Sequence, residues 1–310
     1  MSLRATVIER LLAAGLDPGD TERTVRGALD EDFRYGPDLT SAATAAPGVS
    51  AAVVAVARQP GVLAGLPVAL AVLDAAGIPP ADAETLLSDG SRIDSGTEVL
   101  RITGPLREML GAERTLLNFL THLSGVATAT LAWVDAVAGT GCTVRDTRKT
   151  TPGLRQLEKY AVRCGGGVNH RMGLGDAALV KDNHVAVAGG VVQAIRATRA
   201  VAPHLPLEVE CDTLGQVREA LAEGTGLLLL DNMSVTDLHA AVRLARRYPQ
   251  VRLEASGGLN LDTARAVAET GVDYVAVGAL THSSAALDIG LDMVITPASG
   301  PGHHLDFCQG

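Results

Sequence analysis

Apolar and polar residues alternate along the chain in two rhythms, which change near residue 140. In the first part, helical and strand-like spacings are mixed without a repeating order. They predict helices over 3–15, about 20–31 and 67–77, and strands over 50–57, 61–66, 84–87 and 98–103. A long helical stretch then runs from Pro105 to about Gly139, and we expect an interruption near Gly111 or Gly125 because glycine weakens a helix. This mixture predicts an α+β region.

After residue 140 the pattern becomes a repeated order of strand, loop and helix. The strands are short and nearly continuously apolar, which is typical of strands buried on both faces. They are expected over 142–146, 178–181, 207–211, 227–231, 251–256 and 274–278, with helices over 191–201, 214–223, 235–247 and 263–269. Such alternation predicts a parallel sheet covered by helices. With about six strands, the sequence predicts an incomplete parallel α/β barrel of the TIM type.

The two rhythms divide the chain into two expected domains. Residues 1–115 are predicted to form an N-terminal α+β domain of sandwich type, and residues 116–285 the catalytic α/β barrel. Residues 286–310 no longer alternate, so we expect them to return and pack on the N-terminal domain. The acidic turn segment 30–41 is interpreted as structural.

Composition narrows the class of protein. Hydrophobic residues make up 47% of the 310 positions, aromatic residues only 3%, and the formal net charge is −9, so we expect a globular protein without a nucleic-acid partner. No apolar run approaches the roughly 18 residues of a membrane span, and the N-terminus lacks a signal-peptide pattern. We therefore expect no membrane partner and a cytoplasmic location. The four cysteines form no CxxC pair, which predicts ordinary thiols.

Positive charge is concentrated in one stretch. Between Arg145 and Lys181 there are eight Lys or Arg and three acidic residues, a net charge of +5 in a chain that is acidic as a whole. The only lysines of the chain, Lys149, Lys159 and Lys181, lie in this stretch. A compact ammonium suits phosphate or carboxylate oxygens, although a solvated helix face explains Lys159 equally well. A local site for an anionic ligand is predicted.

Polar or small residues stand at the carboxyl end of every predicted barrel strand. In parallel α/β barrels the reactive groups lie at these ends, on the loops that follow the strands. The strand ends carry Asp146, Arg148 and Lys149, then Lys181, Glu210, Asp231, Ser256 to Gly258, and finally Gly278 and Ala279. Six compliant strand ends indicate a site built by convergence, because charged residues that merely end strands would not all comply.

The residue types indicate three kinds of ligand group. Small residues in the turns at Ser256 and Gly278 let backbone N–H groups approach a phosphate. Guanidinium groups grip carboxylates with two hydrogen bonds. Glu210 and Asp231 suit ribose hydroxyls, a Mg²⁺ ion or acid–base chemistry. The triple glycine Gly165–Gly167 is either an anion cradle or a helix end, and Glu208, on the same side of its strand as Glu210, is either a supporting residue or an ion-pair partner.

These motifs resemble those of the quinolinate phosphoribosyltransferase family. The resemblance is carried by DTRKTTPGLR (146–155), EKYAV (158–162), GGGVNHRMGL (165–174) and VKDNH (180–184). Shorter segments agree as well: ERTLLNFLTHLSGVAT, LEVEC, LLLDNMS, LEASGGL and VAVGALTHS. The acidic segment 30–41 departs from the family form, because Arg34, Tyr35 and Pro37 interrupt it.

The resemblance implies a set of site residues. The substrate-binding set would be Arg114, Thr147, Arg148, Lys149, His170, Arg171, Lys181, Glu210, Asp231, Ser256, Gly257, Gly258, Gly278 and Ala279. Arg148, His170, Arg171 and Lys149 would bind the two carboxylates of quinolinate. The catalytic residues would be Lys149, Lys181, Glu210 and Asp231, with Glu210 and Asp231 holding Mg²⁺ together with the pyrophosphate of the donor.

The resemblance also implies the reaction and the assembly. The enzyme would join quinolinate to 5-phosphoribosyl-1-pyrophosphate and yield nicotinate mononucleotide, pyrophosphate and CO₂ in NAD biosynthesis, with Mg²⁺ as the cofactor. Arg114 would reach the site of the neighbouring subunit in a homodimer with shared sites. Two alternatives stay open: a nicotinate phosphoribosyltransferase, which needs fewer cations, and a phosphate-binding barrel lyase or isomerase, in which Lys181 would be the reactive group.

Overall fold

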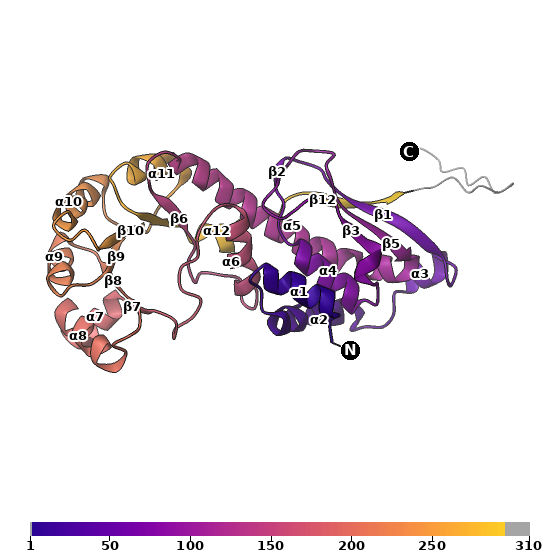
Figure 1. Cartoon of the computed structure of the whole chain (residues 1–310), viewed down its shortest axis with the longest axis horizontal. Coiled ribbons are helices and arrows are strands. Elements are labelled where there is room, and N and C mark those ends of the chain that lie inside the picture. The colour runs from indigo at the N-terminus through magenta and orange to yellow at the C-terminus, as the bar shows by residue number, and fades with distance from the viewer. Residues whose placement is uncertain (1, 295–310) are drawn as a thin grey trace.

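The computed structural model describes residues 2–294, and Figure 1 shows that they form two lobes joined by one long helix. The first lobe contains the N-terminal elements and the second the parallel strands. Buried apolar side chains of both lobes form one continuous cluster, rich in Leu, Val and Ala. No helix in residues 2–294 has the length and apolar character that a membrane crossing needs.

The N-terminal lobe packs helices on an antiparallel sheet. Its helices are α1 (Ala5–Ala13), α2 (Pro18–Phe33), α3 (Leu39–Thr44) and α4 (Leu66–Ala75), with a 3₁₀ turn over Pro80–Asp82. Its strands are β1 (Ser50–Ala57), β2 (Gly61–Val62), β3 (Ala83–Thr85), β4 (Arg92–Ile93) and β5 (Glu98–Pro105). The main sheet has the order β12-β1-β5-β3, in which β12 (Ile289–Val294) comes from after the second lobe, and β2 pairs with β4. The predicted α+β composition of this part is confirmed.

The strand expected over 61–66 ends at Val62, so that part of the prediction was wrong. Gly65 has a φ of 111° and precedes α4, which begins at Leu66. The carboxylate of Asp89 accepts hydrogen bonds from the backbone N–H groups of Gly65 and Leu66. A carboxylate at a helix N-terminus satisfies the free donors there, so the chain turns into a helix instead of extending the strand.

Helix α5 (Leu106–Val137) runs without a break through the first lobe and into the second (Figure 1). The expected interruption at Gly111 or Gly125 was therefore wrong. A Cβ at Gly125 would lie 2.1 Å from the carbonyl oxygen of Ala285, and one at Gly111 would lie 3.0 Å from the ring of Phe33. These glycines permit close packing on the helix surface, and burial of many side chains outweighs their weak helix propensity.

The second lobe is the predicted incomplete barrel, and this prediction is confirmed. Six parallel strands form one sheet in the order β6-β11-β10-β9-β8-β7. They are β6 (Thr143–Arg145), β7 (Ala178–Val180), β8 (Leu207–Cys211), β9 (Leu227–Asp231), β10 (Arg252–Ser256) and β11 (Tyr274–Ala276). Among the described residues β6 and β7 do not pair with each other, so the sheet stays open between them.

Helices surround these strands (Figure 1). They are α6 (Arg155–Cys164), α7 (Asp182–Ala188), α8 (Val191–Val201), α9 (Leu214–Ala222), α10 (Val235–Ala245), α11 (Leu261–Ala268) and the short α12 (Ala279–His282). Capping side chains just before the first helical residue fix where several of these helices begin. Thr213, before α9, and Asn260, before α11, each accept a hydrogen bond from a backbone N–H of the first turn. The loops between strand ends and these starts carry the polar residues.

The chain returns to the first lobe after the barrel. Strand β12 (Ile289–Val294) pairs antiparallel with β1, from Ala57 opposite Ile289 to Ala52 opposite Val294. The rest of the expected return segment, residues 295–310, lies outside the described residues. The sheet of the first lobe thus contains strands that precede the barrel and one strand that follows it. The chain on both sides of the barrel is therefore attached to the first lobe.

Candidate active site

A cavity of about 390 Å³ lies at the carboxyl ends of the barrel strands. Its walls are formed by Thr147, Arg148, Lys149, His170, Arg171, Leu179, Lys181, Glu210, Leu229, Asp231, Glu254, Ser256 and Ala276. Most of the predicted site residues therefore meet in one place. A larger cavity of about 470 Å³ in the N-terminal lobe, beside Leu29 and Phe33, is mostly apolar, and we place the site by converging charge and not by size.

The cationic wall has unsatisfied donors. The Nε atoms of Arg148 and Arg171 are buried and have no hydrogen-bond partner. Burial lowers the pKa of Arg171, and the charge of Arg148 lowers it further, although a guanidinium stays charged. Buried charged donors without partners are uncommon in folded proteins. An anion in the cavity would satisfy both groups.

The loop after β6 is held by a buried ion pair between Asp146 and Lys159. Lys159 on α6 contacts the carboxylate of Asp146, and both side chains have no exposed surface. Asp146 also accepts hydrogen bonds from the backbone N–H of His170 at 2.7 Å and from Nδ2 of Asn169 at 2.6 Å. The solvated-face interpretation of Lys159 was therefore wrong, because helical periodicity cannot reveal a partner on another element.

Burial acts against both members of this pair. It raises the pKa of Asp146 and lowers that of Lys159, while the mutual contact and the hydrogen bonds act in the opposite direction. The Nζ of Lys159 also donates to the backbone oxygen of His170 at 2.9 Å. The pair thus fixes the backbone of His170, and with it the position of Arg171, relative to the loop that carries Arg148.

A second part of the cavity lining, the acidic wall, is formed by Glu210, the penultimate residue of β8, and Asp231, the last residue of β9. Together with the exposed Asp212 they offer carboxylate oxygens that all lie within 4.8 Å of one another. Burial raises the pKa of Glu210, and the charge of Asp231 adds to the shift while that of Lys181 opposes it. Carboxylate oxygens are the ligands that Mg²⁺ prefers, so this group fits the expected ion. Asp212 was missed, although its place directly after a strand was a usable signal.

Asn232 and Gly257 shape the turn beside Asp231. Asn232 has a φ of 52°, a left-handed conformation that no other described residue except glycine adopts. Its Nδ2 donates to Asp231 Oδ2 at 2.6 Å, and a Cβ at Gly257 would lie 2.3 Å from its Oδ1. Gly257 itself has a φ of 84°, a left-handed conformation that favours glycine, and its lack of a Cβ leaves room for the Asn232 side chain. The turn holds Asp231 at the edge of the cavity.

The remaining predicted residues lie beside the cavity or far from it. A Cβ at Gly278 would lie 2.9 Å from Cδ of Lys149, so this glycine leaves room for the lysine chain. Gly257, Gly258 and Ala279 are not among the lining residues. Arg114 is exposed on α5, does not line the cavity and forms no hydrogen bond or ion pair within residues 2–294.

Two further segments have structural roles. A Cβ at Gly165 would lie 2.3 Å from the carbonyl oxygen of Ala127, so the triple glycine lets the end of α6 pack on α5, as expected for a helix end. In the acidic segment 30–41, Asp38 accepts a hydrogen bond from the backbone N–H of Ser41 at 2.9 Å and caps α3. Neither segment lines the cationic cavity.

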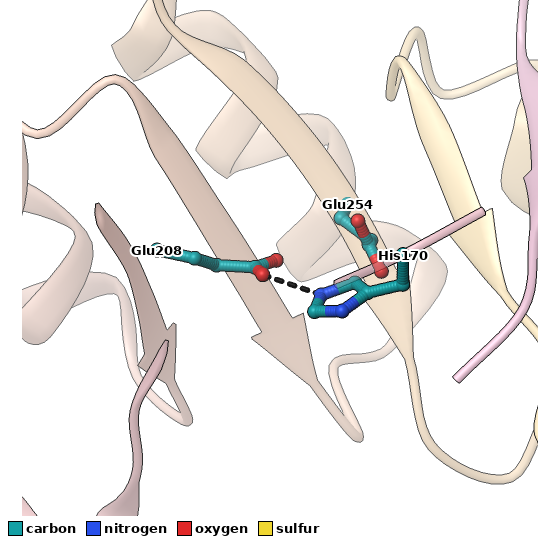
Figure 2. Close-up of side chains that lie close together, drawn as sticks. All are labelled: His170, Glu208 and Glu254. Carbon is teal, nitrogen blue, oxygen red and sulfur yellow. Dashed lines mark hydrogen bonds and ion pairs between the residues drawn. The ribbon is translucent and has the colours of Figure 1, made fainter. Parts of the chain in front are cut away.

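His170 and Glu254, which line the cavity, form a buried cluster with Glu208, and Figure 2 shows these three side chains. His170 Nε2 lies 2.6 Å from Glu208 Oε2, and Glu254 lies beside them on β10. Glu254 forms an ion pair with Arg145 of β6. From the sequence, Glu208 was either a supporting residue or an ion-pair partner. In the structure its carboxylate contacts the imidazole of His170, so Glu208 supports a residue that lines the cavity. Glu254 was missed, although it stands two residues before Ser256 and therefore on the same side of its strand.

Comparison with known proteins gives a consistent result. The family model for the quinolinate phosphoribosyl transferase C-terminal domain matches residues 126–292, and the model for the N-terminal domain matches residues 38–124. Over 272 residues the chain is 56% identical to a nicotinate-nucleotide pyrophosphorylase [carboxylating] of Mycobacterium leprae, which covers 87% of this chain and 96% of the relative.

More distant relatives agree. The human nicotinate-nucleotide pyrophosphorylase [carboxylating] is 41% identical over 241 residues, covering 76% of this chain and 80% of the relative. Among solved structures, NadC from Streptococcus pyogenes superposes with a TM-score of 0.83 at 40% identity, covering 90% of this chain and 99% of that one. The similarity therefore extends over both lobes.

Proposed function

This chain belongs to the quinolinate phosphoribosyltransferase family, and from that premise we propose how its cavity divides the reaction between two walls. The enzyme transfers a phosphoribosyl group from 5-phosphoribosyl-1-pyrophosphate to quinolinate in NAD biosynthesis, with loss of CO₂. The observation that carries the division is that one cavity is lined both by Arg148 and Arg171 and by Glu210 and Asp231. The family match decides against both alternatives.

The cationic wall binds the acceptor. Quinolinate carries two neighbouring carboxylates, one of them beside its ring nitrogen, and the guanidinium groups of Arg148 and Arg171, each with a buried Nε that lacks a hydrogen-bond partner, suit such groups. His170 completes this wall, and Lys149 adds a point charge near Thr147. A single-carboxylate acceptor would leave one of these two guanidinium groups without a carboxylate partner, which favours the dicarboxylate.

The acidic wall binds the donor. Glu210 and Asp231 would accept hydrogen bonds from the ribose hydroxyls and, with Asp212 beside them, would be the residues that hold a Mg²⁺ ion. When bound, the ion neutralises charge on the pyrophosphate. Backbone N–H groups around Ser256, Gly257, Gly258, Gly278 and Ala279 receive the 5-phosphate.

The chemistry needs orientation and charge neutralisation. The ring nitrogen of quinolinate donates its electron pair to C1 of the ribose, and the bond from C1 to pyrophosphate breaks with its electrons on the departing oxygens. Lys149 and Lys181 stabilise that charge. The quaternised nitrogen then stabilises the carbanion left when the adjacent carboxylate departs as CO₂, and water supplies the proton that replaces it. The protein holds the two reactants in line.

The proposal includes an assembly and a location. Arg114 is exposed and without a partner among residues 2–294, which supports its entry into the cavity of a second subunit. The functional unit would then be a homodimer with shared sites, because a twofold interface makes each crossing reciprocal. We place the enzyme in the cytoplasm, where its soluble substrates are made.

An assay of labelled CO₂ tests this function. Purified protein receives quinolinate labelled in its 2-carboxylate, with and without 5-phosphoribosyl-1-pyrophosphate and Mg²⁺. We expect labelled CO₂ only when donor and metal are both present, in equal amount to the nicotinate mononucleotide formed. Release without the donor, or transfer to nicotinate at the same rate, would refute the proposed reaction.

A further inference from the structure

The imidazole of His170 stands between two cavities. One is the candidate substrate cavity, and the other, of about 610 Å³, is lined by residues that include Arg145, Glu208 and Leu227. Backbone contacts with Asp146 and Lys159 fix the main chain of His170 but not its ring. Within residues 2–294 the ring forms one hydrogen bond, between its Nε2 and Glu208. Glu208 therefore decides which way the ring points.

This arrangement is electrostatically unfavourable. Glu208 and Glu254 are 4% and 0% exposed, and within residues 2–294 Arg145 is the one Lys or Arg that pairs with either of them, while Glu208 has only the imidazole of His170. The Oε1 atom of each carboxylate is buried without a hydrogen-bond partner. Burial raises the pKa of Glu254 to about 7, and the charge of Glu208 is the next largest cause. Two facing buried carboxylates with unsatisfied oxygens destabilise a fold, so an apolar residue at 208 would be easier to accommodate.

The cost of this contact falls at the edge of the binding site, where proteins retain unfavourable groups for function. We propose that Glu208 is a positioning residue for the acceptor half of the site, which holds the His170 imidazole by Nε2 so that its other edge faces the carboxylates of quinolinate. The inference rests on the proposed role of His170. It explains why a buried carboxylate stands beside Glu254: without Glu208 the ring is free to turn toward the second cavity.

A metal ion is a weaker explanation of the same cluster. One donor atom from each of His170, Glu208 and Glu254 lies within 4.8 Å of the others, which is close enough for a shared cation. The guanidinium of Arg145 already occupies Glu254, and Nε2 of His170 already faces Glu208 (Figure 2). A cation would have to displace one contact and lie beside a positive charge, so we assign the cluster to positioning.

Three variants test the positioning role: Glu208→Leu removes the acceptor, Glu208→Gln keeps an amide oxygen of matched size, and His170→Ala removes the ring. The measurements are KM for quinolinate, KM for the donor and the midpoint of thermal unfolding. We expect Glu208→Leu to raise the quinolinate KM at least about tenfold, as for a lost hydrogen bond to a charged group, and to leave the donor KM within about threefold. Glu208→Gln should recover most of the loss, and the unfolding midpoint of either variant should not fall.

The outcomes separate the two layers of the argument. If His170→Ala leaves the quinolinate KM unchanged, the proposed role of His170 fails. If His170→Ala raises it and Glu208→Leu does not, only the positioning role of Glu208 is overturned. Equal losses for Leu and Gln, or a parallel rise of both KM values, would mark Glu208 as merely structural. Should Glu208→Leu not fold, Glu208→Asp replaces it, because the shorter side chain keeps the charge but withdraws from His170, and the same rise is expected.

Discussion

Lys159 and Asp146 form an ion pair from which solvent is fully excluded, and the pair connects helix α6 to the loop after β6. Both residues of the pair are linked to the cavity. Asp146 directly precedes Thr147 and Arg148, which line it, and Lys159 contacts the backbone of His170, which also lines it. This fully buried pair therefore supports the residues that bind the acceptor.

Removing one partner of this pair should destabilise the protein strongly. Lys159→Met leaves the Asp146 carboxylate buried without its cation, and we expect a loss of about 3 to 5 kcal/mol in the free energy of unfolding. Arg196→Met is the matched control, because the exposed Arg196 pairs with Glu223 on the surface and should contribute less than about 1 kcal/mol. Urea unfolding measures both. A loss for Lys159→Met no greater than that of the control would contradict the structural role.

The arginines should select the dicarboxylate by shape as well as charge. Arg148→Lys and Arg171→Lys keep a positive charge but lose the planar fork. We expect each variant to lose about 2 to 4 kcal/mol of transition-state stabilisation, measured as a lower kcat/KM for quinolinate. Arg218→Lys, in a distant groove between α9 and α10, serves as the control. Near wild-type kinetics in either cavity variant would remove that arginine from the site.

The buried cluster of His170, Glu208 and Glu254 should make the free energy of unfolding depend on pH. The pKa of Glu254 is about 7 in the folded protein against 4.5 ordinarily, so the unfolded chain loses this proton first as the pH rises. Stability should therefore fall by about 3 kcal/mol between about pH 4.5 and 7 and level off above. Thermal unfolding of wild type and Glu254→Gln across this range measures the effect. Parallel curves for the two proteins would show that Glu254 does not titrate this way.

Subunit mixing tests the shared site. Arg114→Ala and Lys181→Ala should each be inactive, because each removes a cation from every cavity of the homodimer. In a mixed dimer both lesions fall in one cavity and the other is intact, so random exchange should restore up to about a quarter of wild-type activity. If exchange is demonstrated and the mixture stays inactive, Arg114 does not cross between subunits.

The sequence allowed the barrel to be predicted because its strands are apolar on both faces. Leu228, Leu230 and Val275 are almost fully buried, and such runs separated by amphipathic helices leave few other arrangements. Residues that end these strands, such as Lys181 and Asp231, do line one cavity. Strand ends meet at one edge of a parallel sheet, so this convergence follows from topology alone.

Other features depended on contacts between distant elements. The burial of Lys159 depends on Asp146 of another element, and the continuity of α5 depends on Ala285, which packs on Gly125. Glu254 and Asp212 gave only weak local signals, because a single acidic residue in or after a strand is common. The place of Arg114 depends on a second subunit. Periodicity describes how one element meets the core, but not which side chain of another element it meets.

The central claim is that the cavity has an acceptor wall and a donor wall. Calorimetric titration of quinolinate, without donor or Mg²⁺, into wild type, Arg171→Lys and Asp231→Asn tests it most directly. The account predicts that Arg171→Lys weakens quinolinate binding by at least about tenfold, the scale of an incomplete charge-assisted pair, while Asp231→Asn changes Kd by less than about threefold. Weaker quinolinate binding in Asp231→Asn with unchanged binding in Arg171→Lys would contradict the account, since the two walls would then be exchanged.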